Sequence, residues 1–476
     1  MSDLIASYFA RLAVIPSPVL TDISGSGRRA VCGVDLPGLT DRVAGKLASH
    51  GVEHGDRIIA VFGNRLEAAL LLLTAMRHGI TLCLQPAGTG VADLVQLKHD
   101  LGATAVISTT DEAPAGIARL AFEDLTDCAV IKTPVVKQGT PFTITFTSGS
   151  TGAPKGIVHS AESFLRCAKA FNDQAGITGA DCFLNVMPMY YMAGIFNGIL
   201  APLAAGASVV IADAFATPTA LRFWPMIKGN GITALWLSPT MASLIMRLDR
   251  GDKVVPDSLR RVFVGTGAMA ARDAEAFYEA YGLPLLQSYG LSELLYISVD
   301  DADTPNFGST GRPLAGVTIT QDDAGALGFD SEYAFLGYLQ NGVLERHQGQ
   351  FATSDLGTVS SAGVLSISGR SDDIIIRGGV NVNPIELEGL LGSLLKGTPF
   401  CIIGLPDEML GQKVVLVTEG AEADSTVLSK ARALVLDHPG RAQLDGVAAV
   451  QKLPLGPTGK IRRAALHALL ADGADK

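Results

Sequence analysis

Apolar residues along the chain follow two spacings, one typical of helices and the other typical of buried strands. Helical spacing marks residues 39–50, 66–77, 91–101, 161–176 and 241–248, whereas short apolar runs mark residues 57–63, 80–84, 105–108, 142–146, 181–188, 208–212, 233–237 and 261–268. Helices and strands that alternate in this way are typical of parallel sheets covered by helices. The pattern therefore predicts a multilayer α/β fold.

The pattern changes in residues 311–369, where turn residues separate many short β-like pieces. A polar run at residues 369–373 then precedes a last segment with its own apolar pattern. That segment predicts a helix, two strands and a closing helix, the first three at residues 384–395, 400–405 and 413–418. We expect a large N-terminal α/β domain over residues 1–370 and a small C-terminal α+β domain over residues 371–476.

Composition narrows the class of protein. A chain of 476 residues is long enough for two or more domains, and 48% hydrophobic with 18% charged residues is typical of a folded enzyme rather than a disordered chain. The net charge is −10, and no basic run is long enough to follow a nucleic acid backbone. Nucleic acid is therefore not an expected partner.

The cysteines are scattered and include no C-x-x-C pair, which argues against a zinc site or a disulfide framework. The N-terminal residues lack the basic-then-apolar order of a signal peptide. The longest apolar stretch, residues 68–76, is too short to span a bilayer. These features predict a soluble protein of the cytoplasm.

The segment Thr147–Gly156 combines four hydroxyl residues, three glycines and Lys155 directly after an expected strand. Glycine lets backbone N–H groups approach an anion, hydroxyls add donors, and lysine adds positive charge. The spacing matches neither the Walker loop nor the dinucleotide-binding glycine motif. The segment therefore predicts a phosphate-binding loop of another kind, although the same composition also occurs in flexible linkers.

Three further segments are candidates for ligand contacts. Residues 187–194 hold two tyrosines and three methionines, which suits an adaptable pocket wall or ordinary core. The strand expected at 261–268 ends in small residues that would leave room for a ligand. In residues 287–293 a tyrosine could stack on a base and Glu293 could bind magnesium, although glutamate more often lies on a solvated face.

Two positions later in the chain also suit ligand binding. Asp355 could accept hydrogen bonds from ribose hydroxyls, or could simply form a turn. The segment 454–463 is a Gly/Pro-rich loop that presents Lys460 before the closing helix. Each signal is weak alone, and their order along the chain carries more information.

Taken together, these segments resemble the adenylate-forming superfamily, which includes acyl- and aryl-CoA synthetases, peptide-synthetase adenylation domains and luciferases. The resemblance covers nearly the whole chain and rests on ordered motifs: Thr147–Gly156, Pro188–Gly194, Gly265–Ala268, Tyr289–Glu293, Ser354–Asp355, Gly369–Glu388 and Pro457–Lys460. It implies a large N-terminal domain, a small C-terminal domain that is mobile, and the cofactors ATP, Mg²⁺ and coenzyme A.

The resemblance also implies roles for residues at the nucleotide. The ATP phosphates would be held by Thr147, Ser148, Gly149, Ser150, Thr151, Gly152 and Lys155. The adenine and its surroundings would involve Ser288, Tyr289 and Gly290, while Ser292 would contact phosphate and Glu293 would bind magnesium. Asp355 would accept the ribose hydroxyls, and Arg370 would reach the ribose or a phosphate.

Other roles follow for the acid and for the motion between two half-reactions. The acid pocket would be lined by Tyr190, Tyr191, Gly265, Gly267 and Ala268. Lys460 would bridge the acid carboxylate and the α-phosphate. Asp372 occupies the hinge position, and Gly378 with Gly379 belongs to the loop that meets the acceptor in the second half-reaction.

The implied reaction activates a carboxylic acid as acyl-AMP and then transfers the acyl group to coenzyme A. Transfer to a carrier-protein phosphopantetheine or an amine stays open, as does an inactive protein that only binds nucleotide or acyl ligand. Tyr191 replaces the histidine common in CoA ligases of this family, a departure that leaves the gating of the acyl pocket open and indicates an unusual substrate. Pro188–Gly194 contains no acidic residue to pair with an ammonium group, which disfavours an α-amino acid and favours an apolar aryl or medium-length acid.

Overall fold

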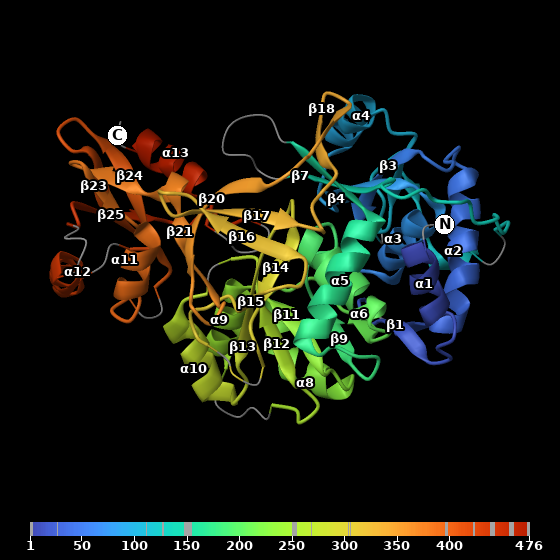
Figure 1. Ribbon diagram of the computed structural model, residues 1–476, viewed down its shortest axis with the longest axis horizontal. Coiled ribbons are helices and arrows are strands. Elements are labelled where there is room, and N and C mark those ends of the chain that lie inside the picture. The colour runs from blue at the N-terminus through green and yellow to red at the C-terminus, as the bar shows by residue number, and fades with distance from the viewer. Residues whose placement is uncertain are drawn as a thin grey trace. The chain divides into compact units, whose positions relative to one another are not determined.

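The computed structural model describes the chain in two compact units. Residues left outside the description are 1–2, 26, 111, 126–127, 147–154, 250–254, 268, 303, 305, 396–397, 422–423, 438–442, 457–460 and 474–476. The first unit comprises residues 1–318 and 330–349, and the second comprises residues 319–329 and 350–476. Figure 1 labels many of the helices and strands of both units.

The first unit contains two large sheets. The eight-stranded sheet has the order β19 (Val343–Arg346), β18 (Gly337–Gln340), β8 (Gly156–Ser160), β7 (Pro141–Phe146), β4 (Thr81–Pro86), β3 (Arg57–Phe62), β5 (Ala105–Ser108) and β6 (Ala118–Arg119). Strands β7, β4, β3, β5 and β6 are parallel, whereas β8, β18 and β19 continue the sheet as antiparallel strands. The central strands β3, β4 and β5 are largely buried on both faces, as expected where helices cover a sheet.

The nine-stranded sheet has the order β15 (Arg312–Pro313), β14 (Leu295–Val299), β13 (Leu285–Leu291), β12 (Arg261–Val264), β11 (Ala234–Leu237), β9 (Cys182–Asn185), β10 (Ser208–Ile211), β1 (Pro18–Asp22) and β2 (Arg29–Cys32). The N-terminal strand β1 pairs in parallel with β10, although they are far apart in the sequence. Sequence patterning missed this early hairpin because its strands are short and its partner is distant.

Helices of the first unit pack on both sheets. They are α1 (Asp3–Leu12), α2 (Leu36–Ala48), α3 (Leu66–His78), α4 (Val91–Leu101), α5 (Ala161–Ala175), η3 (Ala193–Leu200), α6 (Ala201–Ala204), α7 (Thr217–Leu221), α8 (Phe223–Gly229), α9 (Pro239–Leu248) and α10 (Ala271–Tyr281), with 3₁₀ turns η1 (Gly33–Asp35) and η2 (Phe122–Leu125). Helix α5 contacts β7 and β8 of one sheet and β14 of the other, and α3 contacts β4 and β1. These two helices therefore join the sheets into one core.

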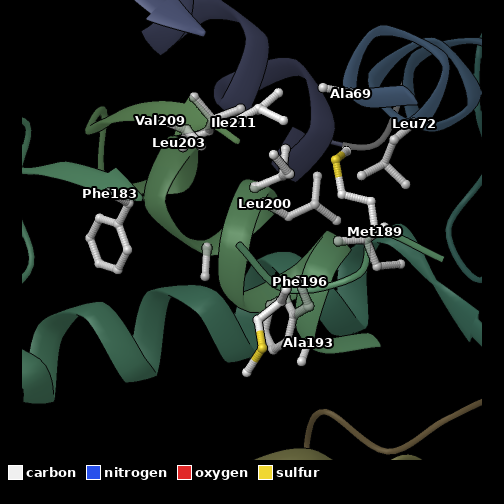
Figure 2. Packing of buried hydrophobic residues seen from close by; sticks show 14 of the residues in the cluster. Ala69, Leu72, Phe183, Met189, Ala193, Phe196, Leu200, Leu203, Val209 and Ile211 are labelled. Atoms are coloured by element: carbon white, nitrogen blue, oxygen red, sulfur yellow. The ribbon is translucent and has the colours of Figure 1, made fainter. Parts of the chain in front are cut away.

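The segment η3 is a π-helix whose eight residues are all buried. Figure 2 shows Ala193, Phe196 and Leu200 of η3 packed with Leu72 of α3 and with Met189. π-Helical geometry is rare and frequently occurs at functional sites. Here it directly follows the tyrosine and methionine segment.

The described part of the second unit has a four-stranded sheet, whose strands β16 and β17 extend two residues beyond the bounds of the unit, a five-stranded sheet and three helices. The first sheet has the order β16 (Val317–Gln321), β17 (Ala326–Ser331), β20 (Phe351–Val359) and β21 (Leu365–Arg370). The second has the order β23 (Val380–Val382), β22 (Ile375–Arg377), β25 (Gly411–Glu419) and β24 (Phe400–Asp407), and β26 (Gly446–Val450) pairs with β25. The helices are α11 (Pro384–Leu391), α12 (Ser425–Asp437) and α13 (Arg463–Gly473), and η4 (Ser371–Asp373) is a 3₁₀ turn.

The predicted α/β fold class is confirmed, and the expected helices and strands lie within a few residues of the observed ones. The division by contacts places β20 and β21 with the C-terminal residues, since both belong to the second unit. The predicted boundary at residue 370 marks the hinge about which the C-terminal residues would rotate. Contacts within one structure do not locate such a hinge, so this boundary stays a prediction. Every helix in the described ranges is too short or too polar for a bilayer span.

Phe164 provides a test of the core, because this side chain of α5 is fully buried and makes edge contacts with Phe142, His159 and Phe196. We expect Phe164→Ala to lower the free energy of unfolding of the first unit by about 3–5 kcal/mol. Val14 is 76% exposed, so Val14→Ala should change it by less than about 0.5 kcal/mol. Urea unfolding of both variants measures the difference, and equal losses would contradict the packing described.

Candidate active site

A pocket of about 150 Å³ opens in the first unit, beside the carboxyl ends of β4 and β7. In parallel sheets, ligands commonly bind at these ends. The described residues that line it are Leu84, Gln85, Pro86, Thr145, Phe146, Tyr190, Tyr191, Met192 and Ser292. The structure thus brings together three predicted site residues from two motifs, Tyr190 and Tyr191 from one and Ser292 from the other, beside the strand that leads into the predicted phosphate loop.

The tyrosine pair forms an aromatic wall of this pocket. The rings of Tyr190 and Tyr191 lie edge to face, with their centroids 5.9 Å apart and an interplanar angle of 80°. Burial, and secondarily the neighbouring Tyr191, raise the pKa of the Tyr190 phenol. The wall is therefore neutral, with apolar faces and phenol groups that can donate hydrogen bonds.

Two asparagines hold the segment that carries these tyrosines, and the sequence analysis identified neither. Asn64 donates to the carbonyl of Met187 at 2.9 Å and accepts from the N–H of Met189 at 2.9 Å. Asn185 donates to the carbonyl of Gly194 at 3.0 Å. Asn64 is the second residue after β3. A polar residue just after a buried strand often lies at a ligand site, and this was the signal in the sequence that could have identified Asn64.

Ser292 and Glu293 lie in the turn between β13 and β14. Nε2 of His159, on β8, donates to the carbonyl oxygen of Ser292 at 2.7 Å. The N–H of Phe335 donates to the carbonyl oxygen of Glu293 at 2.8 Å. The backbone carbonyls of Ser292 and Glu293 are thus held by His159 of β8 and by Phe335, which lies two residues before β18.

Glu293 contacts another residue that the sequence analysis did not identify. The phenol of Tyr338, on β18, donates to Oε1 of Glu293 at 2.8 Å. Nζ of Lys155 lies 5.4 Å from the centroid of the same ring, within the range of a cation–π contact. Tyr338 therefore touches both the predicted phosphate-binding lysine and the predicted magnesium ligand.

The donor set around Glu293 fits magnesium that is bound mainly through a nucleotide. Within the described ranges, Oε2 of Glu293 has no hydrogen-bond donor, and no group of three or more His, Cys, Asp or Glu side chains could hold a metal ion. Magnesium is often held by one or two carboxylates with substrate phosphates and water. One carboxylate beside a phosphate loop suits that mode.

The predicted adenine-binding residues lie on β13. The hydroxyl of Ser288 donates to the carbonyl of Ser298 at 2.8 Å, and the pairing with β14 shifts register between Tyr289 and Gly290. A Cβ at Gly290 would lie 2.2 Å from the carbonyl oxygen of Leu295, so the close strand approach requires glycine there. Position 290 is thus constrained by backbone packing, independently of any ligand.

The predicted pocket glycines after β12 have different surroundings. A Cβ at Gly265 would lie 3.2 Å from the Trp236 ring, whereas at Gly267 the nearest atom, in Pro239, would be 3.8 Å away. A side chain is therefore crowded at position 265 and fits at position 267. At Gly267 a Cβ would make only ordinary van der Waals contact, with the ring of Pro239.

In the second unit, Asp355 and Arg370 face each other across β20 and β21. Their strands pair in register at these two residues, and Nη1 of Arg370 lies 3.7 Å from Oδ1 of Asp355. Burial alone would lower the pKa of Arg370, but Asp355 and Asp372 outweigh it and raise the pKa. Nη2 of Arg370 donates to Ser354 Oγ at 2.5 Å and to Asp372 at 3.2 Å.

The predicted hinge and acceptor-loop residues lie in well-defined turns. A hydrogen bond from Ser354, with smaller help from Arg370, lowers the pKa of Asp372 in η4. Gly378 and Gly379 have φ of 55° and 83° and form the two-residue turn between the paired residues Arg377 and Val380. Consecutive positive φ values are those of a type I′ hairpin, which favours glycine at both positions.

Several predicted residues lie outside the described residues: Thr147, Ser148, Gly149, Ser150, Thr151, Gly152, Ala268 and Lys460. The flanks of the Lys460 segment are described. Leu455 and Ile461 form an antiparallel bridge, and the N–H of Arg462 donates to the carbonyl of Pro454 at 2.8 Å. At the start of α13, Arg463 pairs with Glu388 of α11, an anchor that the sequence analysis missed.

Comparison with known proteins adds relatives that match most of the chain. The model of the family described as AMP-binding enzyme matches residues 34–328. A sulfoacetate–CoA ligase of Cupriavidus necator is 26% identical over 87% of this chain and 88% of the relative, and an indoleacetate–CoA ligase of Aromatoleum aromaticum is 28% identical over 92% of each. ATP-bound MatB from Rhodopseudomonas palustris has the same fold, with a TM-score of 0.86, 22% identity and coverage of 99% of both chains.

The buried histidine behind the turn gives a test through pH. Burial lowers the pKa of His159 to about 4, from an ordinary value of 6.5, so the folded protein keeps the ring neutral. Between pH 6.5 and pH 4 the unfolded chain binds a proton at His159 and the folded chain does not. The contribution of neutral His159 to the free energy of unfolding is therefore present above pH 6.5 and is lost as pH falls toward 4.

We expect the stability difference between the wild type and His159→Gln to fall by roughly 2 kcal/mol from about pH 7.5 to about pH 5. Glutamine keeps an N–H donor but does not titrate. Urea unfolding of both proteins at the two pH values measures the difference. If the difference in free energy of unfolding between the two proteins stayed constant with pH, the pKa of His159 would not be lowered by burial.

Proposed function

Because the chain belongs to the family of AMP-binding enzymes, we propose that it is an AMP-forming carboxylic acid–CoA ligase. A carboxylate oxygen attacks the α-phosphorus of ATP, and the bond to pyrophosphate breaks. The thiol of coenzyme A, having lost its proton, then attacks the acyl carbonyl, and AMP leaves. Two of the matched relatives are CoA ligases, one for sulfoacetate and one for indoleacetate.

One observation in the first unit carries the proposal. The tyrosine wall, Ser292 and the end of β7 enclose a single pocket, although they come from three distant segments of the chain. The strand β7 leads directly into the segment that ends in Lys155, and Glu293 follows Ser292. The pocket proposed for the acid, the proposed phosphate-binding Lys155 and the proposed metal ligand Glu293 thus come from neighbouring parts of the first unit, which supports in-line attack on a nucleotide.

The roles of individual residues are part of the proposal. Residues 147–152 and Lys155 would bind the β- and γ-phosphates, while Ser292 would contact phosphate. Glu293 would hold Mg²⁺, which supplies charge neutralisation at the phosphates when bound. Ser288, Tyr289 and Gly290 would surround the adenine.

In the second unit, Asp355 would accept the ribose hydroxyls and Arg370 would reach the ribose or phosphate. Lys460 would stabilise the charge that develops between the acid carboxylate and the α-phosphate. We place the hinge at Asp372, so that residues 371–476 turn between the two half-reactions and bring the Gly378–Gly379 turn to the acceptor.

The pocket lining indicates the class of acid. No charged side chain is among the described residues that line it, so a substrate tail with an ammonium group would lack a buried partner there. Aromatic faces and phenols suit an uncharged aryl or medium-length acyl acid.

The described cysteines are all free thiols, which fits the cytoplasm as the proposed location.

Pyrophosphate release tests the function. The purified chain is incubated with ATP, Mg²⁺ and a panel of aryl, short, medium and long acids, with and without coenzyme A. We expect release with one class of uncharged acid and a CoA thioester when coenzyme A is present. Release without any thioester would move the acceptor to a carrier-protein phosphopantetheine or an amine, and no release with any acid would refute adenylation.

Lys460 tests the assignment of the catalytic cation. We expect Lys460→Ala to lower the single-turnover rate of acyl-AMP formation by roughly 10²- to 10³-fold, because one donor to the transition state is lost. Lys452, also in the second unit and exposed, provides a matched lysine-to-alanine control that should keep the rate. An unchanged rate in Lys460→Ala would remove this lysine from the mechanism.

A further inference from the structure

Tyr338 stands between two predicted site residues of opposite charge. Its strand β18 pairs with β8, so that Tyr338 lies opposite Ile157 and Leu339 lies opposite Gly156. Lys155 directly precedes β8, which explains why its Nζ reaches a position 5.4 Å from the centroid of the Tyr338 ring. The pairing of β18 with β8 therefore fixes the ring beneath the end of the phosphate loop.

The other end of Tyr338 contacts the carboxylate. Its phenol donates to Oε1 of Glu293 at 2.8 Å. A tyrosine phenol is protonated at neutral pH, so Tyr338 is the donor and the Glu293 carboxylate is the acceptor. A hydrogen bond to an ionised carboxylate is stronger than one between neutral groups.

The same short segment fixes both groups. Phe335 packs edge to face on the Tyr338 ring, with centroids 4.8 Å apart, and its N–H donates to the Glu293 carbonyl at 2.8 Å. At Gly337 a Cβ would lie 1.9 Å from the carbonyl oxygen of Glu345, so glycine allows β18 and β19 to approach closely here. The position of Tyr338 relative to Glu293 is thus set by backbone pairing and not only by its own side chain.

The arrangement keeps two opposite charges apart. No ion pair within 4.0 Å joins Lys155 and Glu293 in the described part of the chain; each contacts a different part of one neutral tyrosine. A direct pair would satisfy the ammonium with the carboxylate and reduce what each could offer to phosphate or metal. The phenol instead occupies Oε1 of Glu293, and Oε2 lacks a donor among the described residues.

We infer that Tyr338 is a positioning residue that separates Lys155 from Glu293, aims the Glu293 carboxylate at the metal ion of the nucleotide and supports Lys155 at the phosphates. The inference rests on the proposed function, because it gives Lys155 and Glu293 the roles stated there. Tyr338 lies outside the motifs of the proposed function, and its hydroxyl and its ring have separate roles. The hydroxyl acts on the metal through Glu293, and the ring acts on the phosphates through Lys155.

Two substitutions separate these parts. Tyr338→Phe keeps the ring and removes the hydroxyl, so we expect the Mg²⁺ concentration for half-maximal pyrophosphate release to rise about tenfold, the size of one charge-assisted hydrogen bond. The KM for ATP at saturating Mg²⁺ should change less than about threefold. Tyr338→Leu removes both parts, so the metal requirement and the KM for ATP should each rise about tenfold.

Metal binding is measured without turnover. Electron paramagnetic resonance of free Mn²⁺, titrated with the full chain and a non-hydrolysable ATP analogue, should show about tenfold weaker Mn²⁺ binding for Tyr338→Phe. The matched control is Tyr333→Phe, which also removes a phenol donor of the first unit, to the carbonyl of Ala315, and should bind Mn²⁺ as the wild type does. Thermal unfolding confirms that the variants are folded.

The outcomes distinguish this inference from the proposed function. Wild-type Mn²⁺ affinity and Mg²⁺ requirement in a folded Tyr338→Phe would overturn the inference, as would equal effects in Tyr333→Phe. If the wild type released no pyrophosphate with any acid, the proposed function would fail, while the Mn²⁺ titration would still decide whether Tyr338 acts on the metal. Weaker Mn²⁺ binding in Tyr338→Phe alone would support the inference.

Discussion

The turn between β13 and β14 depends on a buried hydrogen bond that crosses from one sheet to the other. Neutral His159 on β8 donates to the carbonyl of Ser292, and the neighbouring N–H of Phe335 satisfies the carbonyl of Glu293. A buried carbonyl without a partner is costly, so both bonds restrain the turn to one position. This restraint places Ser292 in the lining of the pocket and orients the Glu293 side chain toward the phenol of Tyr338.

Charge and neutrality are segregated in the first unit. The described pocket lining carries no charged side chain; its polar groups are two tyrosines, one glutamine and two hydroxyls. The charged Lys155 and Glu293 instead contact Tyr338, Lys155 at the ring and Glu293 at the hydroxyl. Such a division suits a reaction in which an uncharged acyl tail is bound beside a highly charged nucleotide. Asn64 and Asn185 stabilise the tyrosine wall through backbone groups, so the wall does not depend on tyrosine side-chain packing alone.

The second unit positions its charges by similar means. Arg370 lies among Asp355, Asp372 and Ser354, which keeps the guanidinium charged and oriented. Arg463 and Glu388 anchor the start of α13, and the Leu455–Ile461 bridge brackets the Lys460 segment. Breaking a buried pair by removing one partner usually costs more than the pair contributes, so Arg463 and Glu388 hold the start of α13 against α11.

The sequence by itself determined the α/β class, most helices and strands, and the order of motifs that identifies the family, because local spacing and turn chemistry encode these features. It also indicated Tyr190, Tyr191, Ser292 and Glu293 as site candidates. It did not reveal the pairing of β1 with β10, the π-helix η3, or the partners Asn64, His159 and Tyr338. Those features depend on contacts between distant segments, such as Tyr338 with Glu293, and residue spacing carries no information about which strands become neighbours. Tertiary structure alone decided them.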